Sequence, residues 1–299
     1  MRAALRSIAA GALLLLQLAL ASPAARADIP GTWSIEPSAG ADAANLTLRF
    51  AIAATGSRHT TSFAIDPAAL GIREALAGRR ETGVRFVLSR EAGSFACTGF
   101  AGNGRGAGSV VFTASDAFLH AMRERGFAGL DEEDALIGAA VDLAVRFVDD
   151  LIGAGYHRPS YRMLVVLRSM GIDGPYVRAV RAAFGRSAPL DAEQLIPLRS
   201  LDVSPRYLMD LRDAGLPPAT PEAAIRARSL RVDAPYVRGL GRAGYAHLDF
   251  EDVLRLRAIG IDGAYIERVE AHGFPHPSLE QLIELKTMRI ISLLAAPGR

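Results

Sequence analysis

The pattern of hydrophobic and polar positions changes its period once along this chain of 299 residues. Between residues 28 and 114, apolar and polar residues alternate, for example over Leu46–Ile52 and Val84–Leu88. Alternation with a period of two is typical of strands that bury one face. Residues that favour turns, such as Glu91-Ala-Gly93, separate these stretches. We therefore expect a small antiparallel β domain of roughly six or seven strands, covered by a short helix near residues 67–76.

The glycine-dense segment Gly102–Gly108 allows two interpretations. Its backbone amides, together with Arg105, could surround an anion, but such a site needs a helix N-terminus directly after the loop. The residues that follow, Ser109–Phe112, have the alternation of a strand instead. An Asn-Gly pair between two strands favours a two-residue turn. We therefore predict a β-hairpin here and no phosphate site.

Beyond residue 114 the period becomes helical, and the sequence repeats itself about every 29 residues. In each unit an aromatic residue is followed eight positions later by Gly and nine positions later by a large apolar residue. The aromatic residues that begin this pattern are Phe118, Phe147, Tyr207, Tyr236 and Tyr265, and Tyr176 keeps the register with the last two residues exchanged. A period of this length is typical of stacked-repeat proteins, which bind partners more often than they catalyse reactions.

Residues that favour helix N-caps recur at two places in each unit. Sixteen residues before the aromatic they are Asp131, Ser160, Asp191, Thr220, Asp249 and, in a truncated last unit, Ser278. Three residues before the aromatic they are Ser115, Asp173, Ser204, Asp233 and Asp262, with Ala144 as the exception. The closing Gly favours a C-cap with positive φ. Each unit is thus predicted to form two helices of about ten residues, which are too short to be stable alone and must stack.

The predicted fold is therefore α+β. A small N-terminal antiparallel β domain (28–114) precedes an α-hairpin repeat domain (115–294), which we expect to be solenoid-like, with about five units and a terminal helix.

The first 27 residues have the pattern of a secretory signal peptide. Arg2 and Arg6 precede an apolar stretch, and Ala25-Arg-Ala27 matches a cleavage site, so we expect export to the periplasm or the medium after cleavage following Ala27. An uncleaved membrane anchor is the alternative. The segment contains three Arg and no acid, so 31 basic and 32 acidic residues remain after cleavage. This balance disfavours binding to a polyanion through bulk charge. With Cys97 as the single cysteine, an internal disulfide is excluded.

A cation recurs eight residues before the aromatic position, near the end of the first helix of the unit. These residues, which we call the basic ladder, are Arg168, Arg199, Arg228, Arg257 and Lys286. Stacking at about one helix diameter, about 10 Å, would align them along one edge, where they could contact an acidic protein, an anionic glycan or phospholipid headgroups. The alternative is structural: the cations would complement the helix dipole and pair locally with Asp173, Asp233 and Asp262.

The sequence has no recognisable catalytic or metal-binding motif. The sequence contains no HExxH, no paired cysteines and no nucleophile elbow. His272 and His276 are separated by Gly273-Phe-Pro275, so one helix does not present both to a metal. We therefore expect neither a metal, nor a cofactor, nor enzymatic activity. Turns such as Met170–Tyr176 resemble the helix-hairpin-helix motif that binds DNA phosphates, but the near-zero charge disfavours nucleic acid as a partner.

The helical unit, clearest in Leu195–Leu216 and Val253–Phe274, resembles the tandem repeats found C-terminal to BlaR-like membrane metallopeptidases, which also occur alone in exported bacterial proteins. The segment Phe86–Phe112 is similar to the β segment that often precedes these repeats. The resemblance covers most of residues 84–292. It implies a sensing or protein-contact role, and it supplies no binding residues. The family's zinc site lies in a separate peptidase domain with an HExxH helix, which this chain lacks, so peptidase activity is not implied.

Together these observations favour a non-enzymatic protein-interaction scaffold of the bacterial envelope. Its partner would be another envelope protein that contacts the basic ladder, and the oligomeric state is left open. The alternative is an envelope small-molecule or glycan sensor or hydrolase. Its pocket would lie between the β domain and the first helical units, lined by Trp33, Arg90, Glu91 and Arg105.

Overall fold

The computed structural model describes residues 28–38, 43–52, 55–156, 159–184 and 190–288. The predicted signal peptide and the end of the predicted last helix, residues 289–294, lie outside these ranges. The described chain has an α+β fold. All its described strands lie between Ile29 and Ala114, and a row of helices begins at Asp116.

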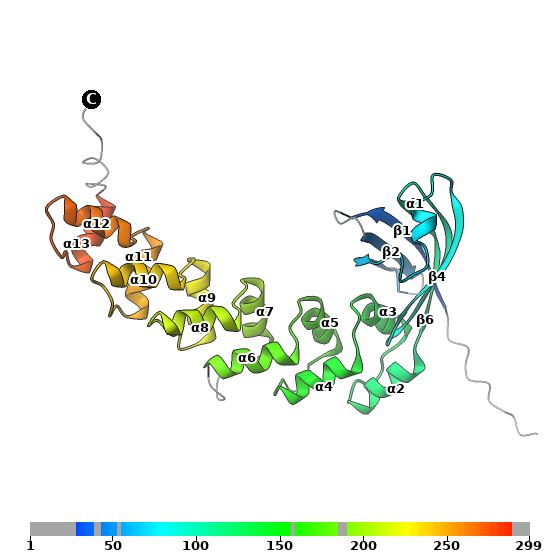
Figure 1. Ribbon diagram of the computed structural model, residues 1–299. Helices are drawn as coiled ribbons and strands as arrows, with labels where there is room; N and C mark the ends of the chain where they lie inside the picture. The colour runs from blue at the N-terminus through cyan, green and yellow to red at the C-terminus, as the bar shows by residue number, and fades with distance from the viewer. Residues whose placement is uncertain (1–27, 39–42, 53–54, 157–158, 185–189, 289–299) are drawn as a thin grey trace, which may run out of the picture.

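Six strands form one antiparallel sheet of order β3-β2-β1-β6-β5-β4 in the described part of the chain. They are β1 (Ile29–Pro37), β2 (Ala44–Ile52), β3 (Ser57–Ile65), β4 (Thr82–Arg90), β5 (Gly93–Gly102) and β6 (Arg105–Ala114). The sheet curves strongly (Figure 1). One face is buried and the other is mostly polar, which is what the alternating sequence predicts.

The glycine-dense segment has a structural explanation. Trp33, on β1, extends its indole across β6 and donates a hydrogen bond from Nε1 to the Thr98 carbonyl on β5 at 3.1 Å. A Cβ at Gly106 would lie 3.0 Å from the indole, and one at Gly108 would collide with that carbonyl. The turn between β5 and β6 is Asn103-Gly104, with φ values of 52° and 76°. The predicted Asn-Gly hairpin is confirmed.

The helix predicted near residues 67–76 is shorter and begins later than expected. It spans Arg73–Ala77 (α1) and contacts β4 and β5. Residues 67–71 form a turn that ends at Gly71, whose φ of 69° is incompatible with a helix. The helix therefore begins only after this glycine.

Twelve further helices follow in the described residues, eleven of them nine residues long. They are α2 (Asp116–Glu124), α3 (Glu132–Ala140), α4 (Val145–Gly153), α5 (Tyr161–Ser169), α6 (Gly174–Phe184), α7 (Ala192–Ser200), α8 (Pro205–Asp213), α9 (Pro221–Ser229), α10 (Ala234–Arg242), α11 (Phe250–Ala258), α12 (Gly263–Ala271) and α13 (Leu279–Thr287). None of the helices in the described residues combines the length and hydropathy that a membrane crossing requires.

The predicted helix ends are confirmed. Every predicted Ser, Thr or Asp N-cap from Ser115 to Ser278 accepts a hydrogen bond from a backbone amide in the first turn of its helix, and Ala144 caps α4 without one. The closing glycines adopt φ values between 87° and 93°, namely Gly126, Gly155, Gly215, Gly244 and Gly273. Local capping chemistry thus determines where these helices begin and end.

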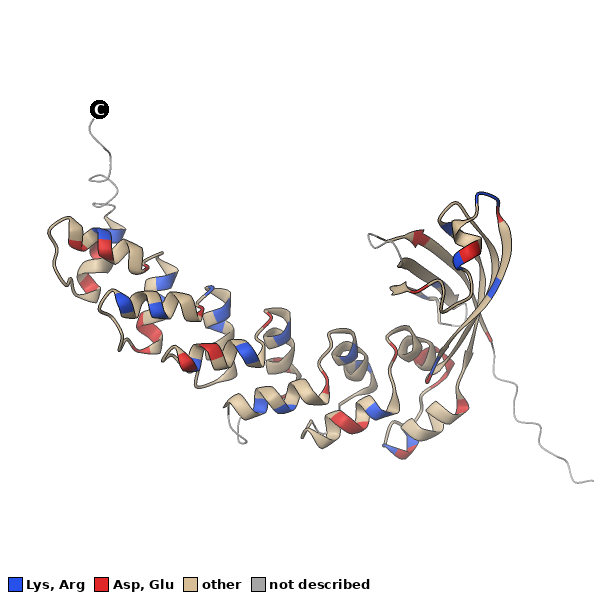
Figure 2. Ribbon diagram, in the orientation of Figure 1, with Lys and Arg blue, Asp and Glu red and all other residues tan. Residues whose placement is uncertain are grey.

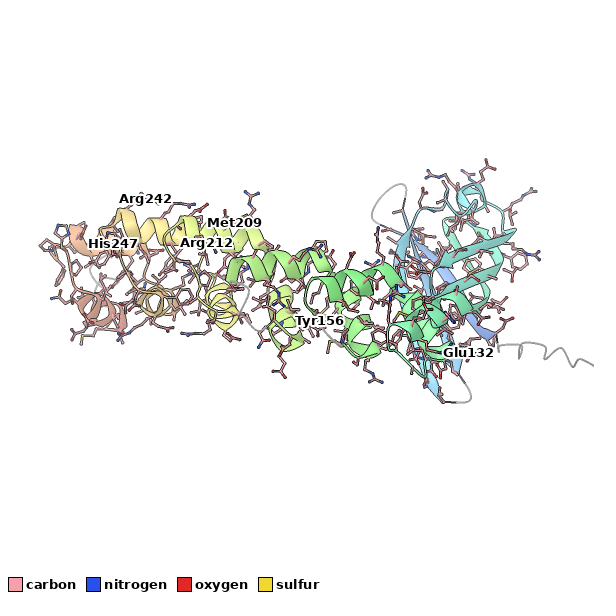
Figure 3. All side chains as sticks on the ribbon, turned by 90° about the horizontal axis from the view of Figure 1, so that it is seen from below. Glu132, Tyr156, Met209, Arg212, Arg242 and His247 are labelled. Atoms are coloured by element: carbon pink, nitrogen blue, oxygen red, sulfur yellow. The ribbon has the colours of Figure 1, made fainter. Side chains whose placement is uncertain are left out.

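The helices extend from the sheet in a single row (Figure 1). Even-numbered helices from α2 to α12 form one layer, in which each contacts the next, and odd-numbered helices from α3 to α13 form the other (Figure 3). The six repeated aromatic residues are at most 8% exposed and therefore belong to the core. One hydrophobic cluster runs from Ile29 in the sheet to Leu285 in α13, so sheet and helices share a core.

Candidate functional site

Each cation of the basic ladder contacts the unit that precedes it. The Arg257 Nε donates a hydrogen bond to the Leu230 carbonyl at 3.1 Å, and its guanidinium lies 4.6 Å from the centre of the Tyr236 ring. Arg199 and Arg228 repeat this arrangement, on the Met170 and Leu201 carbonyls and the rings of Tyr176 and Tyr207. Arg168 lies over Phe147, and Lys286 lies 4.2 Å from the centre of the Tyr265 ring. The ladder therefore joins neighbouring units.

The tyrosines complete this contact in the opposite direction. The hydroxyls of Tyr176, Tyr207 and Tyr236 donate to carbonyls of the following unit at 3.2, 2.7 and 2.7 Å. Burial raises the pKa of Tyr176 and of Tyr207 to about 12, against the opposing effect of the cation on each ring. Each of these rings thus receives a guanidinium from the next unit and donates its hydroxyl to it. We call this two-way contact the tyrosine clamp.

The predicted local pairs between ladder arginines and Asp173, Asp233 and Asp262 are wrong. The carboxylates of these three residues accept hydrogen bonds from amides of their own helices instead. Each guanidinium turns to the C-terminus of the preceding odd-numbered helix, where free carbonyls attract it.

Two ladder arginines also form an ion pair with the preceding unit. The Asp142 carboxylate lies 3.1 Å from Nη2 of Arg168, and the Asp202 carboxylate lies 3.2 Å from Nη2 of Arg228. Arg199, Arg257 and Lys286 form no ion pair among the described residues, since Gly171, Arg231 and Gly260 occupy the place of the aspartates. Within the described part of the chain, three ladder cations are therefore not neutralised by a neighbouring carboxylate.

Of the four residues proposed for a junction pocket, Arg90 and Glu91 lie at the junction. Nη1 of Arg90 is 2.8 Å from the Asp142 carboxylate, and its guanidinium lies over the Phe63 ring at 5.4 Å. The backbone amide of Val145 donates to Glu91 Oε1 at 3.1 Å. Glu91 thus supplies to α4 the side-chain cap that Ala144 does not provide.

Trp33 and Arg105 lie elsewhere. The Trp33 side chain is buried inside the sheet, with 1% exposed. Arg105 begins β6 beside the Asn103-Gly104 turn. It therefore lies at one end of the paired strands β4, β5 and β6, whereas Arg90 lies at the other end. Arg105 lines an open depression of about 390 Å³ together with Glu36, Glu81 and Phe100. The structure does not bring the four residues together.

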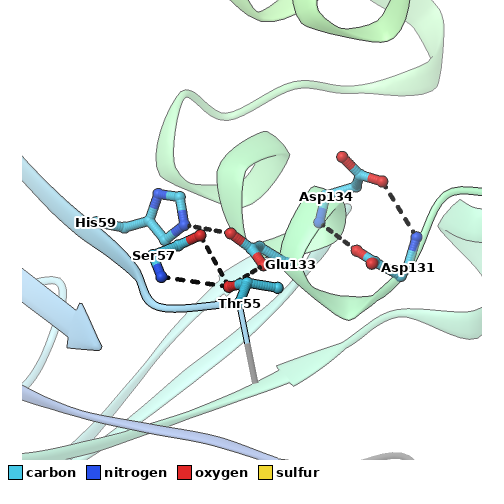
Figure 4. Close-up of polar contacts among 6 residues, drawn as sticks. All are labelled: Thr55, Ser57, His59, Asp131, Glu133 and Asp134. Atoms are coloured by element: carbon cyan, nitrogen blue, oxygen red, sulfur yellow. Dashed lines mark hydrogen bonds and ion pairs between the residues drawn. The ribbon is translucent and has the colours of Figure 1, made fainter. Parts of the chain in front are cut away.

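A polar network at the junction was missed by the sequence analysis. His59 on β3 and Glu133 on α3 are joined by Nε2 and Oε1 at 2.8 Å, and the Thr55 hydroxyl donates to Glu133 Oε2 at 2.9 Å (Figure 4). The bond to His59 is the main cause that lowers the pKa of Glu133. The Thr55 hydroxyl oxygen also lies 2.8 Å from the Ser57 hydroxyl, and since its own proton goes to Glu133 it accepts from Ser57. No local pattern signals this network because the histidine and the glutamate are 74 residues apart.

The Ser57, His59 and Glu133 side chains do not have the geometry of a nucleophile, base and acid. The imidazole Nε2 is bound to Glu133, and the Ser57 hydroxyl is bound to Thr55 rather than to the imidazole. Among the described residues no group of three or more His, Cys, Asp or Glu is placed to hold a metal ion. Figure 4 therefore shows a network that attaches α3 to the sheet.

No protein-family model matches this chain, and no curated protein matches it. The resemblance to the repeats of BlaR-like metallopeptidases rests on the sequence motifs alone.

Proposed function

We propose that this protein is an exported, non-enzymatic scaffold whose helical units form a solenoid that binds another envelope protein along the basic ladder. The observation that carries the proposal is the ladder itself. Its cations recur one per unit, each in contact with the preceding unit, and three of them, Arg199, Arg257 and Lys286, are not neutralised by a carboxylate of the described residues. Acidic and basic side chains are otherwise interspersed along the row (Figure 2).

The tyrosine clamp supports this role because it fixes the cations before a partner arrives. A guanidinium held by a carbonyl and an aromatic ring loses little side-chain freedom on binding, so less conformational entropy opposes association. Its terminal nitrogens can then bind a carboxylate in the bidentate geometry that arginine favours. A shared hydrophobic core gives the row the continuity that a stacked scaffold needs.

The junction does not favour the alternative of a sensor or hydrolase pocket. Arg90 forms an ion pair with Asp142, and Glu91 accepts a hydrogen bond from the Val145 amide. His59 is hydrogen-bonded to Glu133, so each of these polar side chains already has a partner across the junction. Gly138 lies so close to the Tyr161 hydroxyl that a Cβ there would collide with it. These contacts describe a packed joint between sheet and helices.

Affinity capture from an envelope extract tests the proposal. The mature chain and an Arg199→Glu, Arg257→Glu variant are immobilised after circular dichroism has shown equal helix content. We expect specific proteins to be retained by the unmodified chain and lost from this variant. The matched control, Arg206→Glu with Arg238→Glu, changes two exposed cations on even-numbered helices by the same charge and should retain them. Equal retention by all three proteins would show that the ladder is not the contact edge.

A further inference from the structure

Arg231 is an unusual residue at one recurring position of the helical unit. The residue that follows the C-cap of α3, α5, α7, α9 and α11 adopts a left-handed backbone, with φ of 56°, 66°, 55°, 57° and 72° at Asp142, Gly171, Asp202, Arg231 and Gly260. Glycine adopts this conformation without strain, and aspartate tolerates it better than most residues. A long cationic side chain is an unusual choice there.

The other units show what this position does. In two of them it supplies the carboxylate that pairs with the ladder arginine of the next unit, Asp142 with Arg168 at 3.1 Å and Asp202 with Arg228 at 3.2 Å. At Arg231 the charge is reversed. The next ladder residue, Arg257, is bound to the Leu230 carbonyl directly before Arg231, so a second cation begins at the position from which Asp142 and Asp202 reach a ladder arginine.

Neither cation is neutralised within the described chain. Arg231 is exposed and forms no ion pair there, and Arg257 uses Nε for the carbonyl and its flat face for the Tyr236 ring. The nearest helix caps, Asp233 and Asp262, accept hydrogen bonds from the amides of their own helices. The terminal nitrogens of Arg257 form no hydrogen bond or ion pair with the described residues, which leaves their donors for an external acceptor.

We infer that Arg231 and Arg257 bind a carboxylate from an acidic segment of a partner protein, in the place that Asp142 and Asp202 fill in other units. The two internal ion pairs are the template for this ligand chemistry, and planar guanidinium groups match carboxylates well. Lys286 lies one unit further along the row, so an extended acidic segment meets a third unpaired cation. This inference rests on the proposed function and adds to it the contact point and the charge of the partner.

Binding of a fluorescent hexaglutamate peptide to the mature chain tests the inference, with anisotropy as the readout at low ionic strength. Arg231→Asp recreates the arrangement of Asp202 and Arg228, and Arg231→Gly introduces the residue that two other units carry, so both variants fit the backbone. Losing a charge-assisted contact should weaken binding about tenfold in Arg231→Asp, and by a smaller factor in Arg231→Gly. The matched control is Arg206→Asp, an exposed cation on α8, which should bind like the unmodified protein.

Unchanged hexaglutamate affinity in Arg231→Asp would overturn the inference. Stronger binding to phosphatidylglycerol vesicles or to inorganic phosphate than to hexaglutamate would also overturn it, since the ligand would then not be a protein carboxylate. The scaffold proposal is judged separately. If Arg231→Asp has no effect while Arg199→Glu with Arg257→Glu abolishes capture from the extract, the scaffold stands and only this site is wrong.

Discussion

Tyr207 shows how a single side chain connects two units. Its ring lies under the Arg228 guanidinium at 4.9 Å, and its hydroxyl donates to the Val232 carbonyl at 2.7 Å. The phenol is neutral, and burial disfavours the phenolate, which raises its pKa from 10 to about 12. One residue therefore contributes packing, a cation–π contact and a hydrogen bond to the same interface.

Tyr207→Phe should lower the free energy of unfolding at neutral pH by about 1 to 2 kcal/mol, because the buried Val232 carbonyl loses its donor. The substitution should also change how the free energy of unfolding falls at alkaline pH. Since the pKa of Tyr207 is higher in the folded state, its contribution is complete below about pH 10 and is lost as the pH rises towards 12. Urea unfolding across this range should show a smaller alkaline loss of stability in the variant than in the unmodified protein.

Tyr265→Phe is the matched control. The Tyr265 hydroxyl is buried but donates to no acceptor in the described residues, so its removal should cost less at neutral pH than that of Tyr207. Equal losses in the two variants would contradict the assigned role of the Tyr207 hydrogen bond.

At the scale of elements, α4 depends on a residue from the sheet. Its N-cap is Ala144, which has no side-chain acceptor, and Glu91 from the β4–β5 turn accepts the Val145 amide in its place. The cap thus also attaches α4 to the sheet. This contact belongs to the joint that includes Arg90 and Asp142.

Glu91→Ala should destabilise the protein by about 1 kcal/mol, the usual effect of removing an N-cap. Ala144→Ser should restore most of this loss in the Glu91→Ala background and have little effect alone, because the amide already has an acceptor. Denaturant unfolding of the two single variants and the double variant measures the coupling between them. Additive effects would mean that Glu91 does not act as the cap of α4.

The helix ends could be predicted from sequence because capping is local. Ser204 and Asp249, for example, lie within three residues of the amides that they bind. The partners of the ladder could not be predicted in this way, since Arg228 reaches a carbonyl 27 residues earlier. Sequence spacing indicated a cation in five successive units, but the direction of its side chain depends on how the units stack. The network of His59 and Glu133 left no sequence signal for the same reason.

At the scale of the whole molecule, the sheet covers the first end of the row. Helix α3 contacts β5 and β6, and its small residues Gly138 and Ala139 are buried, with Gly138 beside Ala92 of the β4–β5 turn. Later units have larger apolar residues in odd-numbered helices, such as Leu198 in α7. An atypical first unit is what a stack needs when its terminal face packs against another structure.

If each unit is stabilised only by its contacts with adjacent units, a chain shortened at its C-terminal end should keep the fold of the remaining units. Ending the chain after Leu248 removes α11 to α13, including the Arg257 that lies on Tyr236. We expect the sheet and α2 to α8 to stay protected in hydrogen exchange, while α10 exchanges faster because its clamp is lost. The isolated unit 220–245 should be unfolded, since two helices of nine residues do not persist alone in water. Global loss of protection in the shortened chain, or a folded isolated unit, would argue against a solenoid built from mutually dependent neighbours.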